Sequence, residues 1–153
     1  MDIVDQQTRS RMMAGIRGKN TTPELLVRRW LHRNGYRFRL HAKDLPGKPD
    51  LVLRKWNAAV FVHGCFWHRH ENCKLASNPK SRVEFWNTKF EQNIVRDKAS
   101  HTALVNDEWR VATVWECTLK KPIAGQTLEE LCSWLRGDEQ LFDSSSGWND
   151  LVG

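Results

Sequence analysis

The chain has 153 residues, enough for one domain with a hydrophobic core and too few for two full-sized domains. Its 24 Lys and Arg outnumber its 18 Asp and Glu, so the formal charge of +6 favours an anionic partner, nucleic acid before a membrane surface. A composition of 40% hydrophobic and 27% charged residues excludes a disordered chain, and no apolar run is long enough to cross a membrane. The N-terminus lacks a signal-peptide pattern, so we expect a cytosolic protein whose four Cys are reduced or bind metal.

The first half of the chain predicts a helix followed by a β-hairpin. Residues 1–21 are polar and basic, with a possible short helix between Thr8 and Ile16. Thr22 is predicted to cap a helix that ends at Gly35, because Pro23 suits its first turn. A strand is expected over 36–40 and a turn over 45–49, before two strands, 50–53 and 58–63, that form a hairpin.

The second half alternates helices with one strand. A long irregular loop, 64–80, precedes the longest predicted helix, 81–106, and a strand over 111–115. Thr127 is predicted to cap the last helix, and the polar tail 137–153 is expected to fray. The pattern predicts an α/β fold with a mixed central sheet flanked by helices, its single domain spanning residues 22–136.

The loop that follows the hairpin is rich in metal-binding side chains. Cys65, His70 and Cys73 lie within nine residues, and Cys117 follows a predicted strand, where it could complete a four-ligand set. Structural zinc is held by four sulfur and nitrogen ligands at short spacings, so the sequence predicts a zinc-stapled loop. Four unrelated reduced thiols are the alternative; Cys132 lies on the apolar face of the last helix and is assigned to the core.

A carboxylate and several histidines indicate phosphodiester chemistry beside that loop. Asp50 begins a strand next to a returning strand, an arrangement in which metal-dependent nucleases hold Mg²⁺, although Pro-Asp at a strand start is usually only a turn. His63 ends the facing strand, and His68 follows in the loop, where it could act as a general base on water. Ordinary polar roles at a loop edge are the alternative, and His32, His41 and His101 are assigned such roles.

Aromatic residues and one further carboxylate extend the candidate site. Trp86 and Asp97 share one face of helix 81–106, because they are eleven residues apart, so Asp97 could orient His68. The alternative is a core role for Trp86 and a local ion pair for Asp97. Phe66 and Trp67 are either minor core residues or a wedge that enters a DNA base stack.

The sequence resembles the very short patch repair (Vsr) endonuclease family over residues 5–119. The motifs that carry the resemblance are Thr8-Arg-Ser-Arg-Met-Met, Thr22-Pro-Glu-Leu-Leu, Leu45-Pro-Gly-Lys-Pro-Asp50, Val60-Phe-Val-His-Gly-Cys-Phe-Trp-His-Arg-His70, Glu84-Phe-Trp86, Asn93-Ile-Val-Arg-Asp97 and Val114-Trp-Glu-Cys117. The resemblance implies a restriction-endonuclease-like fold and a Mg²⁺-dependent single-strand nick 5′ of the thymine in a T·G mismatch. The partner would be double-stranded DNA, bound by a monomer at the nucleoid of a bacterial cytoplasm.

The resemblance also assigns roles to particular residues. Asp50 and the main-chain carbonyl of Val62 correspond to Mg²⁺ ligands, His68 to the general base and Asp97 to its partner. Glu24 and His63 match further positions of the active centre. The family's structural Zn²⁺ ligands correspond to Cys65, His70, Cys73 and Cys117. Its intercalating aromatic residues correspond to Phe66, Trp67 and Trp86. The resemblance also implies a DNA-clamping arm over residues 1–21, which contains Met13.

Two departures concern the motifs, and three other functions are alternatives. Phe61-Val62-His63 replaces the acid-x-Lys of the general nuclease pattern, which favours a His-based mechanism in which Val62 offers only its carbonyl. The second departure is the spacing of two residues between His70 and Cys73, which varies within the family that the sequence resembles. The rival functions are a non-catalytic zinc-stapled DNA-binding module, a restriction-type nuclease that cuts both strands, and a single-strand or RNA-binding domain with stacking Trp residues.

Overall fold

A mixed five-stranded sheet forms the centre of the molecule. The computed structural model describes residues 20–146. The strands are β1 (Arg39–Leu40), β2 (Leu51–Leu53), β3 (Ala58–His63), β4 (Arg110–Trp115) and β5 (Leu141–Asp143), arranged in the order β1-β2-β3-β4-β5. The first three strands are antiparallel, and β4 and β5 run parallel to β3. The mixed α/β sheet and the hairpin between β2 and β3 are therefore confirmed.

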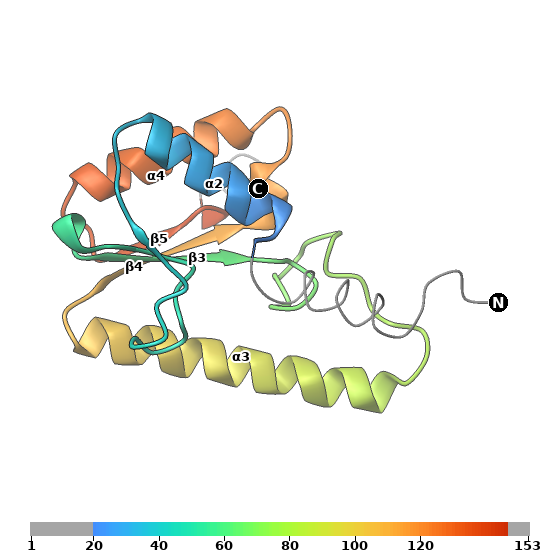
Figure 1. Cartoon of the computed structure of the whole chain (residues 1–153). Helices are drawn as coiled ribbons and strands as arrows, with labels where there is room; N and C mark the ends of the chain where they lie inside the picture. Colours follow the sequence, from blue (N-terminus) through green and yellow to red (C-terminus); the bar gives the residue numbers. More distant parts are fainter. Residues whose placement is uncertain (1–19, 147–153) are drawn as a thin grey trace, which may run out of the picture.

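Helices cover both faces of this sheet. Figure 1 shows α2 (Thr22–Arg33) and α4 (Ala124–Arg136) on one face and the long α3 (Val83–Asn106) on the other. Short 3₁₀ turns, η1 (Arg54–Trp56) and η2 (Glu116–Leu119), follow β2 and β4. Within the described range 20–146, no helix is long and apolar enough to cross a membrane.

The two-sided burial explains why the inner strands are almost uniformly apolar. Along β3, Ala58 and Val60 pack with the α2 and α4 layer, whereas Ala59 and Phe61 pack with the α3 layer. Neighbouring side chains point to opposite faces of a strand, and here each face meets helices. By the same alternation, His63 faces the α3 side, where its ring contacts Phe61 and His101.

The start of α2 differs by one residue from the predicted start. Thr21, rather than Thr22, is the N-cap, and its hydroxyl accepts a hydrogen bond from the Glu24 amide at 3.4 Å. Thr22 then begins the helix itself, with Pro23 in the first turn, where no helical hydrogen bond is lost. With either cap Glu24 lies in the first turn, and in the structure its side chain is only 1% exposed.

The start of α4 was also predicted too late. The helix begins at Ala124, and Thr127 lies buried inside it, with its amide donating to the Ile123 carbonyl. Gly125 and Gln126 carry no apolar periodicity, so the first turn gave no helical signal. The Thr127 side chain packs toward the core rather than capping the helix.

The remaining differences concern the outer strands. The predicted strand 36–40 is reduced to Arg39–Leu40, and Leu141–Asp143 of the predicted tail forms edge strand β5. Leu141 is exposed, so periodicity could not reveal a strand whose order comes from pairing with Val111 and its neighbours. Part of the segment 137–146 is thus integrated into the sheet.

Gly47 fixes the turn that leads to Asp50. Its φ of +75° favours glycine, and a Cβ there would lie 2.6 Å from the Ser100 Cβ of α3. We expect Gly47→Ala to lower the free energy of unfolding by about 2–3 kcal/mol, as measured by urea denaturation. Two costs add: the backbone strain of a positive φ at alanine and the steric overlap of the new Cβ with Ser100. Ser100→Gly should recover part of this loss.

Gly125→Ala is the matched control for that substitution. No atom lies within 4 Å of a Cβ at Gly125, and its φ is not in the left-handed region, so the change should be neutral or stabilise by up to about 1 kcal/mol. Equal stability of Gly47→Ala and wild type would show that the turn does not depend on close contact with α3.

Candidate active site and metal centre

The candidate residues meet at one edge of the sheet, because several strands end or begin there. β3 and β4 are parallel and finish at this edge with His63 and Trp115, which are paired in the register. β2 runs in the opposite direction, so Asp50, which precedes it, lies at the same edge. The loop 64–80 and η2 continue from β3 and β4 and carry three of the four cysteines.

Four Cys and His side chains converge beside this edge. The potential ligand atoms of Cys65, His70, Cys73 and Cys117 all lie within 4.8 Å of one another. His70 Nδ1 is 3.6 Å from the Cys65 sulfur and 3.4 Å from the Cys117 sulfur. A tetrahedral zinc ion with ordinary bond lengths separates sulfur and nitrogen ligands by about 3.6 Å, so the donor set and the spacing fit zinc.

The surroundings of the cluster also suit a metal. The indole of Trp115 stacks on the His70 ring, with centroids 4.1 Å apart and planes at 9°, which fixes the orientation of the imidazole. In the metal-free protein, the hydrogen bond to Cys117 and burial raise the pKa of the Cys65 thiol. A bound cation would reverse that preference, because thiolate is the form that ligates metals.

Asp50 lies in a second potential metal cluster, with Glu24 and His41. The Val62 amide donates a 2.7 Å hydrogen bond to Asp50 Oδ2. In an extended strand the N–H and C=O of one residue point toward the same neighbouring strand, so the Val62 carbonyl is directed to the side on which Asp50 lies. Two carboxylates and a carbonyl form an oxygen-rich set that fits Mg²⁺.

Burial and charge repulsion perturb Asp50. Desolvation raises its pKa from 3.8 to about 7, the Val62 hydrogen bond opposes the shift, and the nearby Glu24 charge adds to it. A buried carboxylate next to a second one is unfavourable when ionised and without a cation. The pair is therefore suited to binding a divalent ion, which would offset both charges.

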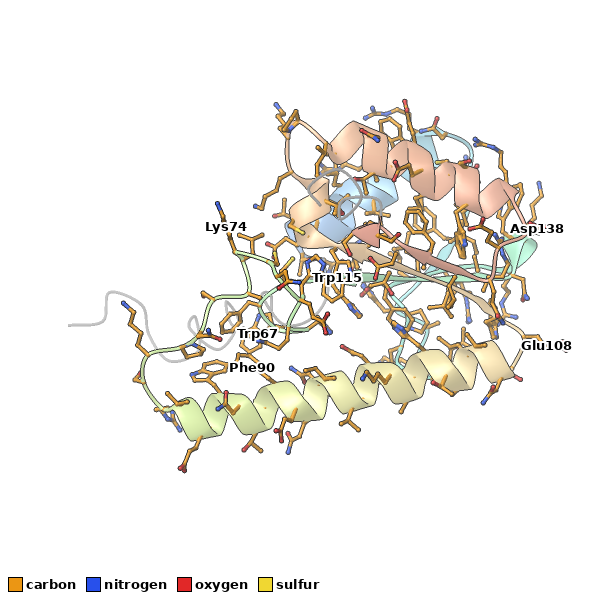
Figure 2. The ribbon with its side chains drawn as sticks, turned by 180° about the vertical axis from the view of Figure 1, so that it is seen from behind. Trp67, Lys74, Phe90, Glu108, Trp115 and Asp138 are labelled. Atoms are coloured by element: carbon orange, nitrogen blue, oxygen red, sulfur yellow. The ribbon has the colours of Figure 1, made fainter. Side chains whose placement is uncertain are left out.

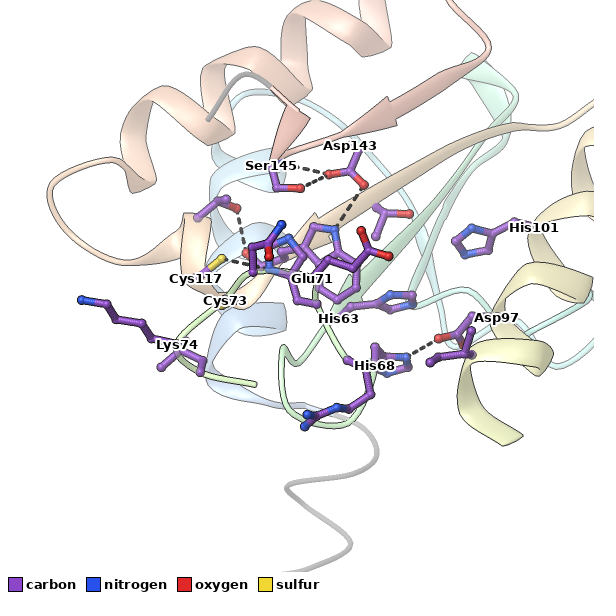
Figure 3. A pocket seen from close by; sticks show the side chains of 18 of the residues that line it. His63, His68, Glu71, Cys73, Lys74, Asp97, His101, Cys117, Asp143 and Ser145 are labelled. Carbon is purple, nitrogen blue, oxygen red and sulfur yellow. Dashed lines mark hydrogen bonds and ion pairs between the residues drawn. The ribbon is translucent and has the colours of Figure 1, made fainter. Parts of the chain in front are cut away.

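His68 and Asp97 form a short polar contact at this edge. His68 Nδ1 lies 2.6 Å from Asp97 Oδ2, and Figure 3 shows the pair facing a cavity of about 850 Å³ that His101 also lines. A second hollow, about 340 Å³, reaches the same pair from the side of Gly47 and is also lined by Lys89 and Arg96. Water and a phosphate group can thus approach His68.

His63 supports His68 through ring stacking. The two imidazoles are 3.8 Å apart and nearly parallel, at 4°. Burial first, and then the neighbouring His68 and His101, lower the pKa of His63, which favours its neutral form. Nitrogen lone pairs lie in the ring planes, so two parallel rings cannot direct theirs to one ion, and the grouping with Asp97 is poorly built for a metal.

The predicted aromatic residues gather where the loop meets the start of α3. The Phe66 ring centroid is 5.1 Å from that of Trp67 and 5.5 Å from that of Trp86, and Trp67 also contacts Trp86 at 5.5 Å. Figure 2 labels Trp67 and Phe90 in this region; the Phe90 ring is buried and lies 5.3 Å from the Phe66 ring and 5.7 Å from the Trp86 ring. Phe66, Trp67 and Trp86 are each only partly buried, so the cluster is anchored by Phe90 and keeps exposed ring surface.

Three further residues lie at the site, although the sequence assigned ordinary polar roles to His41 and His101 and no individual role to Asn93. Asn93 donates to the Trp67 carbonyl at 3.0 Å, His41 contacts Glu24, and His101 packs on Phe61 at 4.6 Å. His101 lies one helical turn after Asp97, so helical spacing could have indicated it. His41 directly follows the predicted strand 36–40, and only the pairing of that strand with β2 brings it beside Asp50. Met13 lies outside the described residues.

Known proteins resemble this chain over most of its length. The family model of the DNA mismatch endonuclease Vsr matches residues 1–75. The type II nicking enzyme V.XorIIP of Xanthomonas oryzae is 49% identical over 118 residues, covering 77% of this chain and 86% of the relative. The DNA mismatch endonuclease Vsr of Escherichia coli is 37% identical over 140 residues, covering 90% of this chain and 89% of the relative.

Proposed function

This chain belongs to the Vsr family of DNA mismatch endonucleases, and we propose that it makes a Mg²⁺-dependent nick 5′ of the thymine in a T·G mismatch. Such a nick would start very short patch repair of deaminated 5-methylcytosine. The relatives are named as endonucleases and nicking enzymes, which weighs against a non-catalytic DNA-binding module. The observation that carries the proposal is the His68–Asp97 pair at the sheet edge that also holds Asp50.

The His68–Asp97 pair can supply general-base catalysis. A carboxylate only accepts hydrogen bonds, so Asp97 Oδ2 selects the tautomer with the proton on His68 Nδ1. Nε2 is then free to take a proton from the attacking water. The stacked, neutral His63 limits rotation of the His68 ring without adding a competing charge.

Asp50 and the Val62 carbonyl are the proposed Mg²⁺ ligands, with Glu24 beside them. When bound there, Mg²⁺ would supply positive charge that polarises the scissile phosphate and stabilises the leaving oxygen. The Val62 amide holds one oxygen of Asp50 and so fixes the orientation of the carboxylate. Cys65, His70, Cys73 and Cys117 are the proposed Zn²⁺ ligands, and they brace the loop that carries His68.

The aromatic cluster and nearby cations provide a surface for mismatched DNA. Phe66, Trp67 and Trp86 are the proposed wedge, because a T·G pair lowers the cost of unstacking. Lys89 and Arg96 line the hollow beside His68, where they can neutralise phosphates, so binding should weaken with salt. Residues 1–21, including Met13, are proposed to clamp the duplex from the other side.

The remaining assignments follow from the family. We propose that residues 22–136 form the endonuclease domain and that 137–146 completes its sheet through β5. The protein would act as a monomer on nucleoid DNA in the cytoplasm of a bacterium, since the relatives are bacterial repair and nicking enzymes.

A nicking assay tests this function directly. One strand of a duplex with a single T·G mismatch and randomised flanks is labelled, and a T·A duplex serves as the control. We expect one Mg²⁺-dependent cut 5′ of the thymine, blocked by EDTA and restored by excess Mg²⁺. His68→Ala should slow the cut by about 10²–10³-fold. Tight binding without a cut in any flanking context would contradict the proposal, as would equal cutting of both duplexes.

A further inference from the structure

His41 contacts both acidic residues of the proposed Mg²⁺ site, one through its ring and the other through its backbone. Its Nε2 lies 3.0 Å from both oxygens of Glu24, and because a carboxylate only accepts, the imidazole donates. Its backbone amide donates to the Asp50 carbonyl at 3.0 Å. One residue thus ties Glu24 of α2 to the main chain of Asp50 across the gap between the helix and the sheet.

The backbone at His41 shows that this placement is specific. His41 has a φ of 48°, in the left-handed region that non-glycine residues seldom adopt, directly after β1. The following amide, Ala42 N–H, donates to the Pro49 carbonyl, so the chain remains tied to the segment before Asp50. This bend directs the imidazole toward α2 instead of leaving it along the strand.

Arg28 also contacts the Glu24 carboxylate but cannot replace His41. Arg28 contacts only Oε2, at 3.2 Å, from one turn along the same helix, and its side chain is partly exposed. Glu24 is 1% exposed, so a free carboxylate at this position would have few alternative hydrogen-bond donors. The orientation of Glu24 toward Asp50 therefore depends on the imidazole.

We propose that His41 is a positioning residue that holds Glu24 in the orientation needed for divalent-cation binding beside Asp50. The proposal rests on the assignment of that site to Mg²⁺ in the proposed function. His41 makes no contact with the reacting atoms in this role. It lowers the reorganisation that the two carboxylates undergo when the cation binds, as hydrogen-bond partners of metal ligands commonly do.

Mn²⁺ binding provides a test that does not depend on nicking. Free Mn²⁺ is measured by electron paramagnetic resonance, with zinc-loaded protein on an uncleavable T·G duplex and Asp50→Ala as background. We expect His41→Leu to weaken Mn²⁺ binding about tenfold or more. His41→Gln should remain within about threefold of wild type, because its amide can still donate to Glu24. His32→Leu, on the exposed side of α2, should change nothing.

The nicking reaction then distinguishes a positioning role of His41 from general damage to the fold. The Mg²⁺ concentration for half-maximal nicking should rise in His41→Leu far more than the rate at saturating Mg²⁺ falls. If His41→Leu does not fold, His41→Asn takes its place, since its amide is too short to reach Glu24.

Three outcomes would overturn the inference. The first is an unchanged Mn²⁺ affinity in His41→Leu, and the second is wild-type Mn²⁺ binding no tighter than that of Asp50→Ala. The third is a loss of Mn²⁺ affinity in His41→Gln as large as that in His41→Leu, which would indicate that His41 coordinates the ion directly. A different result would overturn the proposed function and still support the inference. In that case wild type binds Mn²⁺, His41→Leu does not, and wild type fails to nick the duplex.

Discussion

Asp50→Asn is expected to abolish Mg²⁺-dependent nicking, with a loss of at least about 10⁴-fold, while making the Mg²⁺-free protein more stable at pH 8. The amide can still accept the Val62 hydrogen bond, so the local fold should persist. It carries no charge, however, and cannot act as an anionic ligand. A gain in stability together with a loss of activity is typical of a residue kept for function rather than for folding.

The pH dependence of stability follows from the direction in which the pKa of Asp50 is shifted. Burial raises the pKa of Asp50 from 3.8 to about 7, so the folded protein binds a proton more tightly than the unfolded chain. The resulting stabilisation is present below about pH 4 and is lost as the pH rises through about 7. At pH 8 the stabilisation lost relative to low pH amounts to about 4 kcal/mol at most, and Asp50→Asn should recover part of it.

Urea unfolding at pH 4 and pH 8, without added Mg²⁺, measures this effect. The stability of wild type should fall more steeply between the two pH values than that of Asp50→Asn. Asp44→Asn is the matched control, because Asp44 lies on the surface, pairs with Arg39 and should leave nicking within a few-fold of wild type. Equal pH slopes for wild type and Asp50→Asn would show that Asp50 is not buried as an unfavourable charge.

Cys117→Ser is expected to release zinc, lower the free energy of unfolding by more than about 4 kcal/mol and eliminate nicking. The Cys117 thiol reaches the cluster from η2, whereas the other three proposed ligands belong to the loop 64–80. Without it the loop loses its connection to the sheet edge. His68 and the aromatic cluster are carried by that loop, so both proton transfer and mismatch binding should fail together.

Zinc content, measured by mass spectrometry of the purified proteins, is the primary readout for Cys117→Ser. Wild type should contain one zinc per chain. Cys132→Ser offers a matched change of the same residue type, because Cys132 is buried on α4 away from the cluster, and it should retain the full zinc content. A wild type without zinc, or an equal loss in both variants, would refute the assignment.

The central architecture of this protein could be predicted from the sequence because its signals are local. Apolar runs specified β2, β3 and β4, and an eleven-residue spacing correctly placed Trp86 and Asp97 on one face of α3. Clustering of Cys65, His70 and Cys73 in one loop indicated a metal site without knowledge of the fold. In each case the chemistry and the spacing lie within one continuous segment.

Tertiary structure decided everything that depends on segments meeting across the molecule. Only strand pairing could show that Leu141–Asp143 is a strand, and only the bend at His41 could bring its imidazole to Glu24. The perturbed pKa of Asp50 likewise arises from burial and from a carboxylate twenty-six positions away in the chain. The sequence thus determined which chemical groups are available, and long-range packing decided their mutual orientation, because hydrogen bonds and charges act through space rather than along the chain.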